Sequence, residues 1–334
     1  MARPRGFSLL EIMIAMALGL VLLAAFLAVL QRCRGQFAVN ESLARLQDSA
    51  RHALSVLVAD LEHAGAYGFA RSAHVRVVRG GAVLAQGNAL RQPDVAGTTA
   101  AVPSLPAGAH DCGINFALDL ELPVQGSDNR FAPGNGARDC APTASAGGAR
   151  PGSDTLTVRH ASLNRVPPHA GRLQLYWRHL AAFGFQDLFF DGQPPGPVDR
   201  DNEVRDLEIH TYYIANNSVG RAGWPALRVK SLTEAAGAAQ FRDEEVLPGV
   251  EDLQVEFGIA ENGRVSYLAP DLSTLRGKPV VAVRVWLRIR ADVTEGPFFD
   301  GRALNYAGVA FVPTPAESAL RRILVERTVT LRNR

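Results

Sequence analysis

The sequence has almost no net charge and no long block of one charge sign. Its 334 residues include 35 Lys and Arg against 33 Asp and Glu, which gives a formal net charge of +2 at pH 7. Proteins that bind nucleic acids through phosphate contacts usually present a basic patch interleaved with aromatic residues, and no such stretch occurs here. We therefore expect no nucleic-acid partner.

The motifs of common catalytic and cofactor sites are also missing. There is no HExxH, G-x-S-x-G or GxxxxGK[ST] motif and no GxGxxG after a strand, and the eight histidines are scattered. Carboxylates alternate, as in the first half of a calcium loop, along Asp199-Arg200-Asp201-Asn202-Glu203. However, Val204 stands where that loop needs its turn glycine, and His210 where it needs its last glutamate. We interpret this segment as a solvated acidic loop and expect neither catalysis nor a cofactor.

Proline is absent between Arg5 and Gln92, so a helix in this stretch meets no proline break. Within it, Ile12 to Leu30 is a run of nineteen residues without a polar or charged side chain. At about 1.5 Å per residue the run is ~28 Å long, close to the ~30 Å hydrocarbon core of a bilayer. It can span a membrane.

The helical period continues beyond the apolar run. Apolar residues recur every three or four positions, at Leu43, Leu46, Ala50, Leu54, Leu57 and Leu61. The charged residues Glu41, Arg45, Asp48, Arg51 and Asp60 occupy the other faces. Gly65 and Gly68 predict that the helix ends just before them. The pattern predicts one helix from about Phe7 to about His63, with one stripe packed on the rest of the protein.

The residues before the apolar run are unusual for a simple anchor. Glu11 lies at the edge of the spanning segment, where a carboxylate costs up to about 2.5–3.5 kcal/mol, so it needs a partner. An ordinary signal peptide, cleaved near Ala24-Ala25, would give no reason for Glu11 or for Gly6 directly before Phe7.

This segment resembles the class III signal of type IV pilins and type II secretion pseudopilins. The resemblance implies that prepilin peptidase cuts between Gly6 and Phe7 on the cytoplasmic side and that the new amino terminus on Phe7 is N-methylated. It also implies that Glu11 pairs with the free terminal amine of a neighbouring subunit during assembly. Such pairing would make the buried carboxylate tolerable.

Cysteine is scarce, with only three residues and no CxxC pair. Cys112 and Cys140 bound much of a weakly patterned stretch, and on the oxidising periplasmic side we expect them to form a disulfide. Closing that loop would stabilise the fold by roughly 3.5 kcal/mol. Metal ligation is the alternative, which no His or Cys spacing supports. Cys33 has no predicted partner within the chain. It is either a small packed residue on the helix or a residue that pairs with another subunit.

The C-terminal half is rich in predicted strands. Alternating or β-branched and aromatic segments occur at residues 154–159, 172–177, 207–214, 227–230 and 325–331. Two clearer strands each have one apolar face, formed by Leu253, Val255, Phe257 and Ile259 in one and by Val281, Val283, Val285, Leu287 and Ile289 in the other.

The opposite faces of these two strands carry complementary charges. Asp252 and Glu256 lie on one strand, and Arg284, Arg288 and Arg290 on the other, which predicts that the two strands pair in one sheet. We expect a solvated face with weak ion pairs. The alternative is that Arg284, Arg288 and Arg290, which we call the arginine row, bind an acidic ligand.

Several segments resemble the PilW-type minor pilins. They include Tyr212-Tyr213-Ile214, the stretch from Leu247 to Gly258 and the ending from Val329 to Arg334. The resemblance runs from Gly6 to the C-terminus, and residues 70–150 do not match in detail. It implies an α+β fold in which a long N-terminal transmembrane and amphipathic helix packs on a C-terminal antiparallel β-rich head.

The expected organisation is a leader (1–6), a transmembrane part of the helix (7–30), a periplasmic amphipathic part (31–65), a loop-rich region (66–152) and a β-rich head (153–334). The resemblance implies a minor pilin in the inner membrane, single-pass with a periplasmic head, that primes pilus assembly and enters the surface pilus, with capping of the tip as a further expectation. Its implied partners are other minor pilins, the major pilin, prepilin peptidase and the inner-membrane assembly platform. The alternatives are a J-type minor pseudopilin of type II secretion and an anchored adhesin or ligand-binding head.

Overall fold

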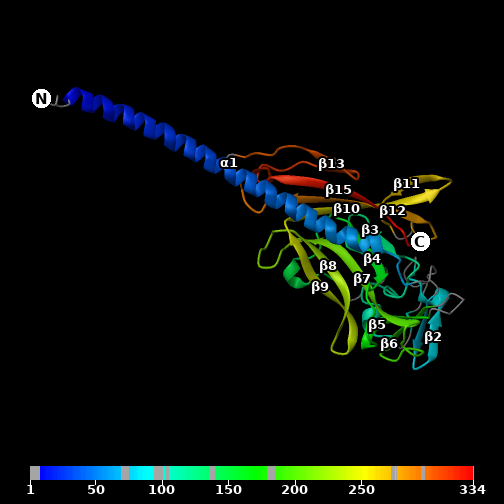
Figure 1. Ribbon diagram of the computed structural model, residues 1–334. Coiled ribbons are helices and arrows are strands. Elements are labelled where there is room, and N and C mark those ends of the chain that lie inside the picture. The colour runs from blue at the N-terminus through cyan, green and yellow to red at the C-terminus, as the bar shows by residue number, and fades with distance from the viewer. Residues whose placement is uncertain are drawn as a thin grey trace.

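The computed structural model describes residues 8–68, 75–93, 101–102, 105–134, 140–178, 186–271, 275, 277–294 and 298–333. The expected leader (1–6), including Gly6, and the following Phe7 lie outside the described residues. Figure 1 shows one long helix, α1 (Leu9–His63), that projects from a β-rich head. This is the predicted α+β architecture.

Helix α1 runs for 55 residues through Gly19 and Gly35 without interruption, as predicted. It ends just before Gly65, whose φ of +76° favours glycine. A Cβ at this position would also lie 2.3 Å from the Asn333 carbonyl oxygen. The chain therefore turns at a glycine that both the backbone conformation and the close C-terminal segment require.

Strands of the described residues form two sheets and a small hairpin. A nine-stranded sheet contains β1 (Val75–Arg79), β2 (Ala82–Gln86), β3 (Val124–Ser127), β4 (Thr155–Ala161), β5 (Ala170–Arg178), β6 (Gln186–Asp191), β7 (Asn202–Ala215), β8 (Ala226–Ala235) and β9 (Ala238–Pro248). A four-stranded sheet contains β10 (Val250–Glu261), β11 (Arg264–Leu268), β12 (Val280–Arg290) and β15 (Arg322–Thr330). The hairpin is β13 (Leu304–Tyr306) and β14 (Val309–Phe311).

Strand β7 organises the larger sheet. Its first part pairs with β5, its last part with β8, and its middle with β4 along the other edge. The strand order is β2-β1-β6-β5-β7-β4-β3, with β9 added through β8. All these pairs are antiparallel except β1 with β6, which is parallel. The predicted strands at 172–177, 207–214 and 227–230 are confirmed within β5, β7 and β8. Those at 154–159 and 325–331 are confirmed as β4 and β15, except that Asp154 and Leu331 lie just outside them.

The main core forms where the second half of α1 meets both sheets. The helix contributes Leu46, Ala50, Leu57 and Leu61, all nearly inaccessible, which confirms the predicted packed stripe. Strands β4, β7, β10, β12 and β15 supply the facing aliphatic residues. Asp60, predicted on a face outside this stripe, is nevertheless turned toward the head, where its carboxylate contacts side chains of β4 and β7.

The predicted pairing of the two clearest strands is confirmed. In the antiparallel β10–β12 pair, Asp252 lies opposite Arg288 and Glu256 opposite Arg284. The alternate residues Val255 and Val283 are buried against the helix. The period of two thus fixed both faces of this sheet.

The region 66–152 contains more order than the loops expected from its composition. Strands β1, β2 and β3 and three short 3-10 helices lie within it, at Gly87–Leu90, Ala107–Ala109 and Ala144–Ala146. A second apolar core lies here and includes Phe116, Leu118 and both cysteines of the Cys112–Cys140 disulfide. The predicted disulfide is confirmed, and Cys33 is free and exposed on α1.

We expect loss of this disulfide to destabilise the head. In a Cys112→Ser/Cys140→Ser variant the 28-residue separation is no longer closed, so the free energy of unfolding should fall by about 3.5 kcal/mol. Thermal unfolding of the detergent-solubilised full chain measures the effect. Cys33→Ser is the matched control and should leave the melting temperature unchanged. Equal melting of the double variant and the control would contradict a stabilising role.

Candidate assembly surface and polar clusters

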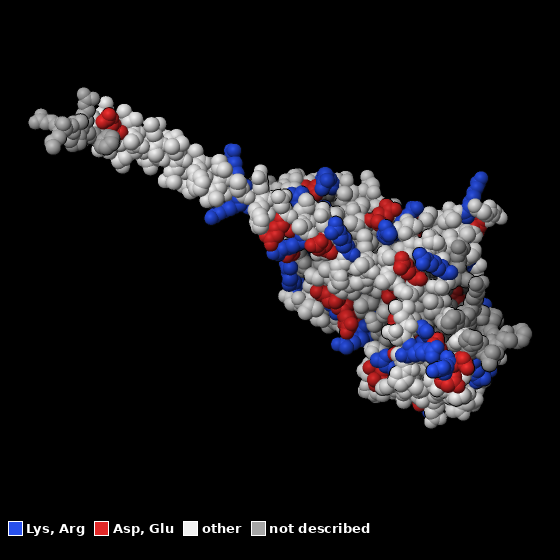
Figure 2. All heavy atoms as spheres, viewed as in Figure 1, with Lys and Arg blue, Asp and Glu red and all other residues white. Residues whose placement is uncertain are grey.

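The first half of α1 is exposed along its length and is not part of the cores of the described head residues. Every residue from Ser8 to Phe37 is exposed, including Leu22 at 71% and Phe26 at 62%. The helix is long enough to span a membrane, with a mean hydropathy of 2.9 over its most apolar window and none of that window buried. Figure 2 shows this segment as a nearly uncharged rod, whereas both charge signs are interspersed over the visible face of the head. An apolar surface of this extent needs a membrane or other helices around it.

Glu11 has a local role at the start of this helix. The Ser8 side chain accepts a hydrogen bond from the Leu10 amide at 3.2 Å, and the Glu11 carboxylate accepts one from the Ser8 amide at 2.8 Å. These contacts form a capping box, which satisfies amide groups that have no partner inside the helix. The sequence signal for this box is the spacing Ser8-Leu9-Leu10-Glu11, from which it was not predicted.

Of the sequence-predicted site residues, Glu11 and Cys33 lie on the projecting helix, and Cys112 and Cys140 lie inside the head. Gly6 and Phe7 are outside the described residues. The acidic segment that leads into β7 is exposed from Asp199 to Asp201, as expected, and Asp199 accepts hydrogen bonds from the Asp201 and Asn202 amides. Glu203 differs because it is buried and pairs with Arg205 at 2.8 Å.

One end of the arginine row is buried, which corrects the expectation of a solvated face. Arg288 Nε lies 3.2 Å from Glu251 Oε2, and Arg322 binds the same carboxylate at 2.7 and 2.9 Å. Asp252 accepts a hydrogen bond from the Tyr306 hydroxyl at 2.5 Å. Arg288, Glu251 and Asp252 are each about 5% exposed or less.

The cover over this network comes from the β13–β14 hairpin. The Arg288 guanidinium carbon lies 3.7 Å from the centre of the Phe311 ring, and Arg288 also donates to the Tyr306 hydroxyl. Burial and the neighbouring Asp252 carboxylate raise the pKa of the Tyr306 hydroxyl. Since Arg288 and Arg322 are paired with buried carboxylates and the hairpin covers Arg288, this end of the row is a structural network.

The other end of the row is solvated, as predicted. Arg284 Nη1 lies 3.4 Å from Glu256 Oε2, with both side chains about a third exposed. Arg284 also stacks over the Tyr267 ring at 3.8 Å. This pair therefore has the exposure expected of a weak surface ion pair.

The structure brings together three residues that the sequence left scattered. Asp60 from α1, His160 from β4 and His210 from β7 place their ligand atoms within 4.8 Å of one another. His210 Nδ1 lies 2.6 Å and the Tyr212 hydroxyl 2.5 Å from the same Asp60 oxygen. The sequence offered one hint, since Asp60 lies three residues after Leu57 and directly before Leu61 and therefore borders the predicted packed stripe.

Burial opposes ionisation of Asp60, but its contacts with His160, His210 and Tyr212 outweigh burial and hold the pKa of this carboxyl below its usual value. For His160, burial likewise opposes the charged form, and the facing Asp60 carboxylate raises the pKa above the ordinary value. The cluster is therefore an electrostatic contact between the end of the helix and the sheet.

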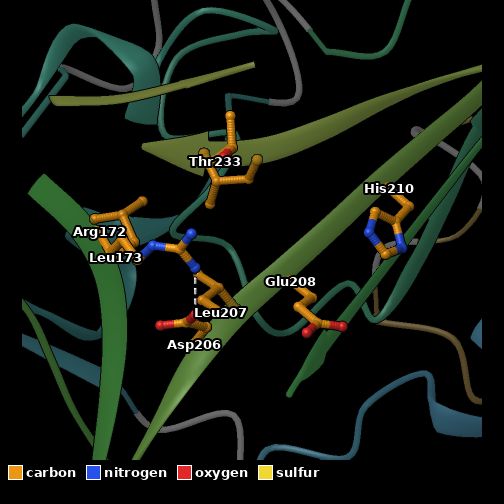
Figure 3. Close-up of a pocket in the computed structure, with 8 residues that line it drawn as sticks. Arg172, Leu173, Asp206, Leu207, Glu208, His210 and Thr233 are labelled. Atoms are coloured by element: carbon orange, nitrogen blue, oxygen red, sulfur yellow. Dashed lines mark hydrogen bonds and ion pairs between the residues drawn. The ribbon is translucent and has the colours of Figure 1, made fainter. Parts of the chain in front are cut away.

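A cavity of about 310 Å³ lies beside this cluster along β7. Figure 3 shows Asp206, Glu208 and His210 following one another along the strand, with Arg172 paired to Asp206 at the far end from His210. Leu173, Leu207 and Leu232 complete much of its wall. His210 thus belongs both to the cavity wall and to the Asp60 cluster.

Two known family models match this chain, one in its C-terminal part and one at its N-terminus. A family model described as type IV pilus-assembly protein W matches residues 211–333, and a model of the prokaryotic N-terminal methylation motif matches residues 1–27. No curated protein matches the chain. Among solved structures, the type IV-like pilin TTHA1219 from Thermus thermophilus matches at 15% identity and a TM-score of 0.25, covering 58% of this chain and 81% of that one. Residues 211–333 are thus similar to the PilW family of type IV pilus-assembly proteins, and residues 1–27 to the prokaryotic N-terminal methylation motif.

Proposed function

We propose that this protein is a minor pilin of the type IV pilus that primes pilus assembly together with other minor pilins. The observation that supports this proposal most directly is the uncovered apolar half of α1 at the end opposite the head. In the inner membrane this helical segment satisfies its own backbone hydrogen bonds. In a filament, side-by-side packing with the helices of other subunits would replace the lipid around it. The head would lie in the periplasm, where its disulfide is stable.

The match to the methylation motif at residues 1–27 supports a processing step as part of this proposal. Prepilin peptidase would remove residues 1–6 and leave Phe7 as the methylated amino terminus. Residues 7–30 would then be the membrane segment, with residues 31–65 as its periplasmic continuation. The inner-membrane assembly platform would receive this subunit with other minor pilins and the major pilin, and a place at the filament tip fits a subunit that starts assembly.

The test uses a strain that lacks this protein, complemented with wild-type or variant chains. We expect wild type to restore surface pili and to carry a methylated Phe7 by mass spectrometry. Gly6→Val should stay uncleaved and should not restore efficient piliation, since a branched side chain replaces the small residue before the scissile bond. Gly6→Ala keeps a small residue there and is the matched control.

Sheared surface pili and secreted proteins are measured in the same strains. Loss of pili with normal secretion supports the pilus role. Loss of type II secretion with normal pili would overturn it and identify a minor pseudopilin. A mature amino terminus other than methylated Phe7 would overturn the processing step for either filament.

A further inference from the structure

The Asp60, His160 and His210 cluster has the composition and spacing of a metal site. Its ligands come from three separate elements, so that only the folded head assembles them. His160 Nε2 lies 3.4 Å from Asp60 Oδ1, and His210 Nδ1 lies 2.6 Å from Asp60 Oδ2. In a tetrahedral zinc site with bonds of about 2.0–2.1 Å, neighbouring ligand atoms are roughly 3.4 Å apart. Of the three ligand pairs, the first already has this spacing and the second needs to open by roughly 0.8 Å to reach it. The ligand nitrogens of the two histidines lie within 4.8 Å of each other.

The hydrogen bonds of His160 leave its second nitrogen facing a carboxylate. Its Nδ1 lies 3.0 Å from the Ala161 carbonyl oxygen, which can only accept, so Nδ1 carries the proton. In the neutral imidazole, Nε2 then presents a lone pair toward the negatively charged Asp60. Two acceptors that face each other in a nearly buried site need a cation between them, either a second proton on the ring or a metal ion.

We propose that Asp60, His160 and His210 bind a Zn²⁺ ion that fastens the end of α1 to strands β4 and β7. Two imidazoles and one carboxylate are a ligand set that zinc accepts, and water from the adjacent cavity supplies the fourth ligand. His210 ligates through Nδ1, and its ring proton moves to Nε2. This site is independent of the pilus role proposed above.

The groups around the ligands support this arrangement. Metal-binding histidines usually donate their other ring nitrogen to a carbonyl or carboxylate, and bound carboxylates are themselves hydrogen-bonded. His160 has the Ala161 carbonyl for this purpose, and Asp60 has the Tyr212 hydroxyl. Tyr212 is therefore a positioning residue for the carboxylate and not a ligand.

The test measures metal binding by the untagged full chain in detergent, stripped with a chelator and titrated at about pH 8, where protons compete less with the metal. We expect one Zn²⁺ per chain and an increase in melting temperature with Zn²⁺, because the ion binds the folded state alone. Co²⁺ in the same site should give the visible absorption of a four-coordinate ion. Asp60→Asn, His160→Gln and His210→Gln should each abolish the Co²⁺ band and weaken Zn²⁺ binding by at least about 100-fold, more than the loss of an outer-shell partner.

Two variants serve as controls. Tyr212→Phe should retain the site but weaken Zn²⁺ binding by about 10–100-fold, as expected for an outer-shell partner. His63→Gln should bind Zn²⁺ like wild type, although its ring lies only 5.9 Å from that of His160. If the wild-type chain binds no Zn²⁺ at about 100 µM, a concentration corresponding to roughly −5.5 kcal/mol, the proposal is overturned. Binding that persists unchanged in the ligand variants would equally overturn it.

Discussion

Replacing Arg288 with Gln is expected to lower the free energy of unfolding by about 3 kcal/mol, whereas Arg284→Gln should cost no more than about 1 kcal/mol. The two arginines lie on the same strand and the same face, each opposite an acidic residue. They differ in burial, because the β13–β14 hairpin covers Arg288 and leaves Arg284 about a third exposed.

The size of the expected loss follows from what remains after the change. Breaking a buried ion pair typically costs about 3–5 kcal/mol, since the partner charge stays buried without compensation. Here Glu251 keeps its two hydrogen bonds from Arg322, and Asp252 keeps those from Tyr306 and Ser153. The lower end of the range therefore applies.

Thermal unfolding of the detergent-solubilised full chain compares the two variants. For a head of this size, a loss of about 3 kcal/mol corresponds to a melting temperature lower by roughly 6–12 °C. The Arg284→Gln variant should stay within a few degrees of wild type. If both variants melt together, the β13–β14 hairpin does not seal the network as the structure shows it.

Glu11→Val is expected to remove the protein from its complex with other minor pilins, and Glu11→Gln should do the same. We propose that Glu11 pairs with the terminal amine of a neighbouring subunit, as the resemblance to type IV pilins implies. Without the carboxylate that amine is left unpaired among apolar helices, at a cost of about 3 kcal/mol or more, which weakens assembly by more than about 100-fold.

The two substitutions separate assembly from helix capping. Glutamine can still complete the capping box with Ser8, because its side-chain oxygen accepts the Ser8 amide as the carboxylate does. Valine loses both the charge and the cap. Co-purification of the variants with partner pilins from membranes measures assembly, and immunoblots of the membrane fraction check that both variants are inserted.

Two results for the Glu11 variants would contradict this prediction. If Glu11→Gln enters the complex normally and Glu11→Val does not, the carboxylate serves only the capping box seen at Ser8. Normal recovery of both variants would mean that neither the cap nor the charge is needed for assembly. Ser8→Ala is a useful control, since it weakens the cap by about 1 kcal/mol and leaves the charge of Glu11 in place.

Local patterns in the sequence were sufficient for the helix and for the pairing of β10 with β12. The apolar run, the absence of proline and the glycines after His63 determined α1 nearly to the residue. Strict alternation around Val255 and Val285 fixed the faces of the paired strands, because a shift by one residue would turn every side chain over. The same reasoning failed for β9, whose exposed and intermediate residues do not show one clean apolar face.

Burial of charged groups was decided by parts of the chain far away in sequence. The opposing charges of Asp252 and Arg288 could be read from the pattern, but their cover is supplied by Tyr306 and Phe311 on a separate hairpin. Similarly, 100 residues separate Asp60 from His160, and a further 50 separate His160 from His210. A helix and two strands must dock before these side chains meet, so their common site exists only in the tertiary structure.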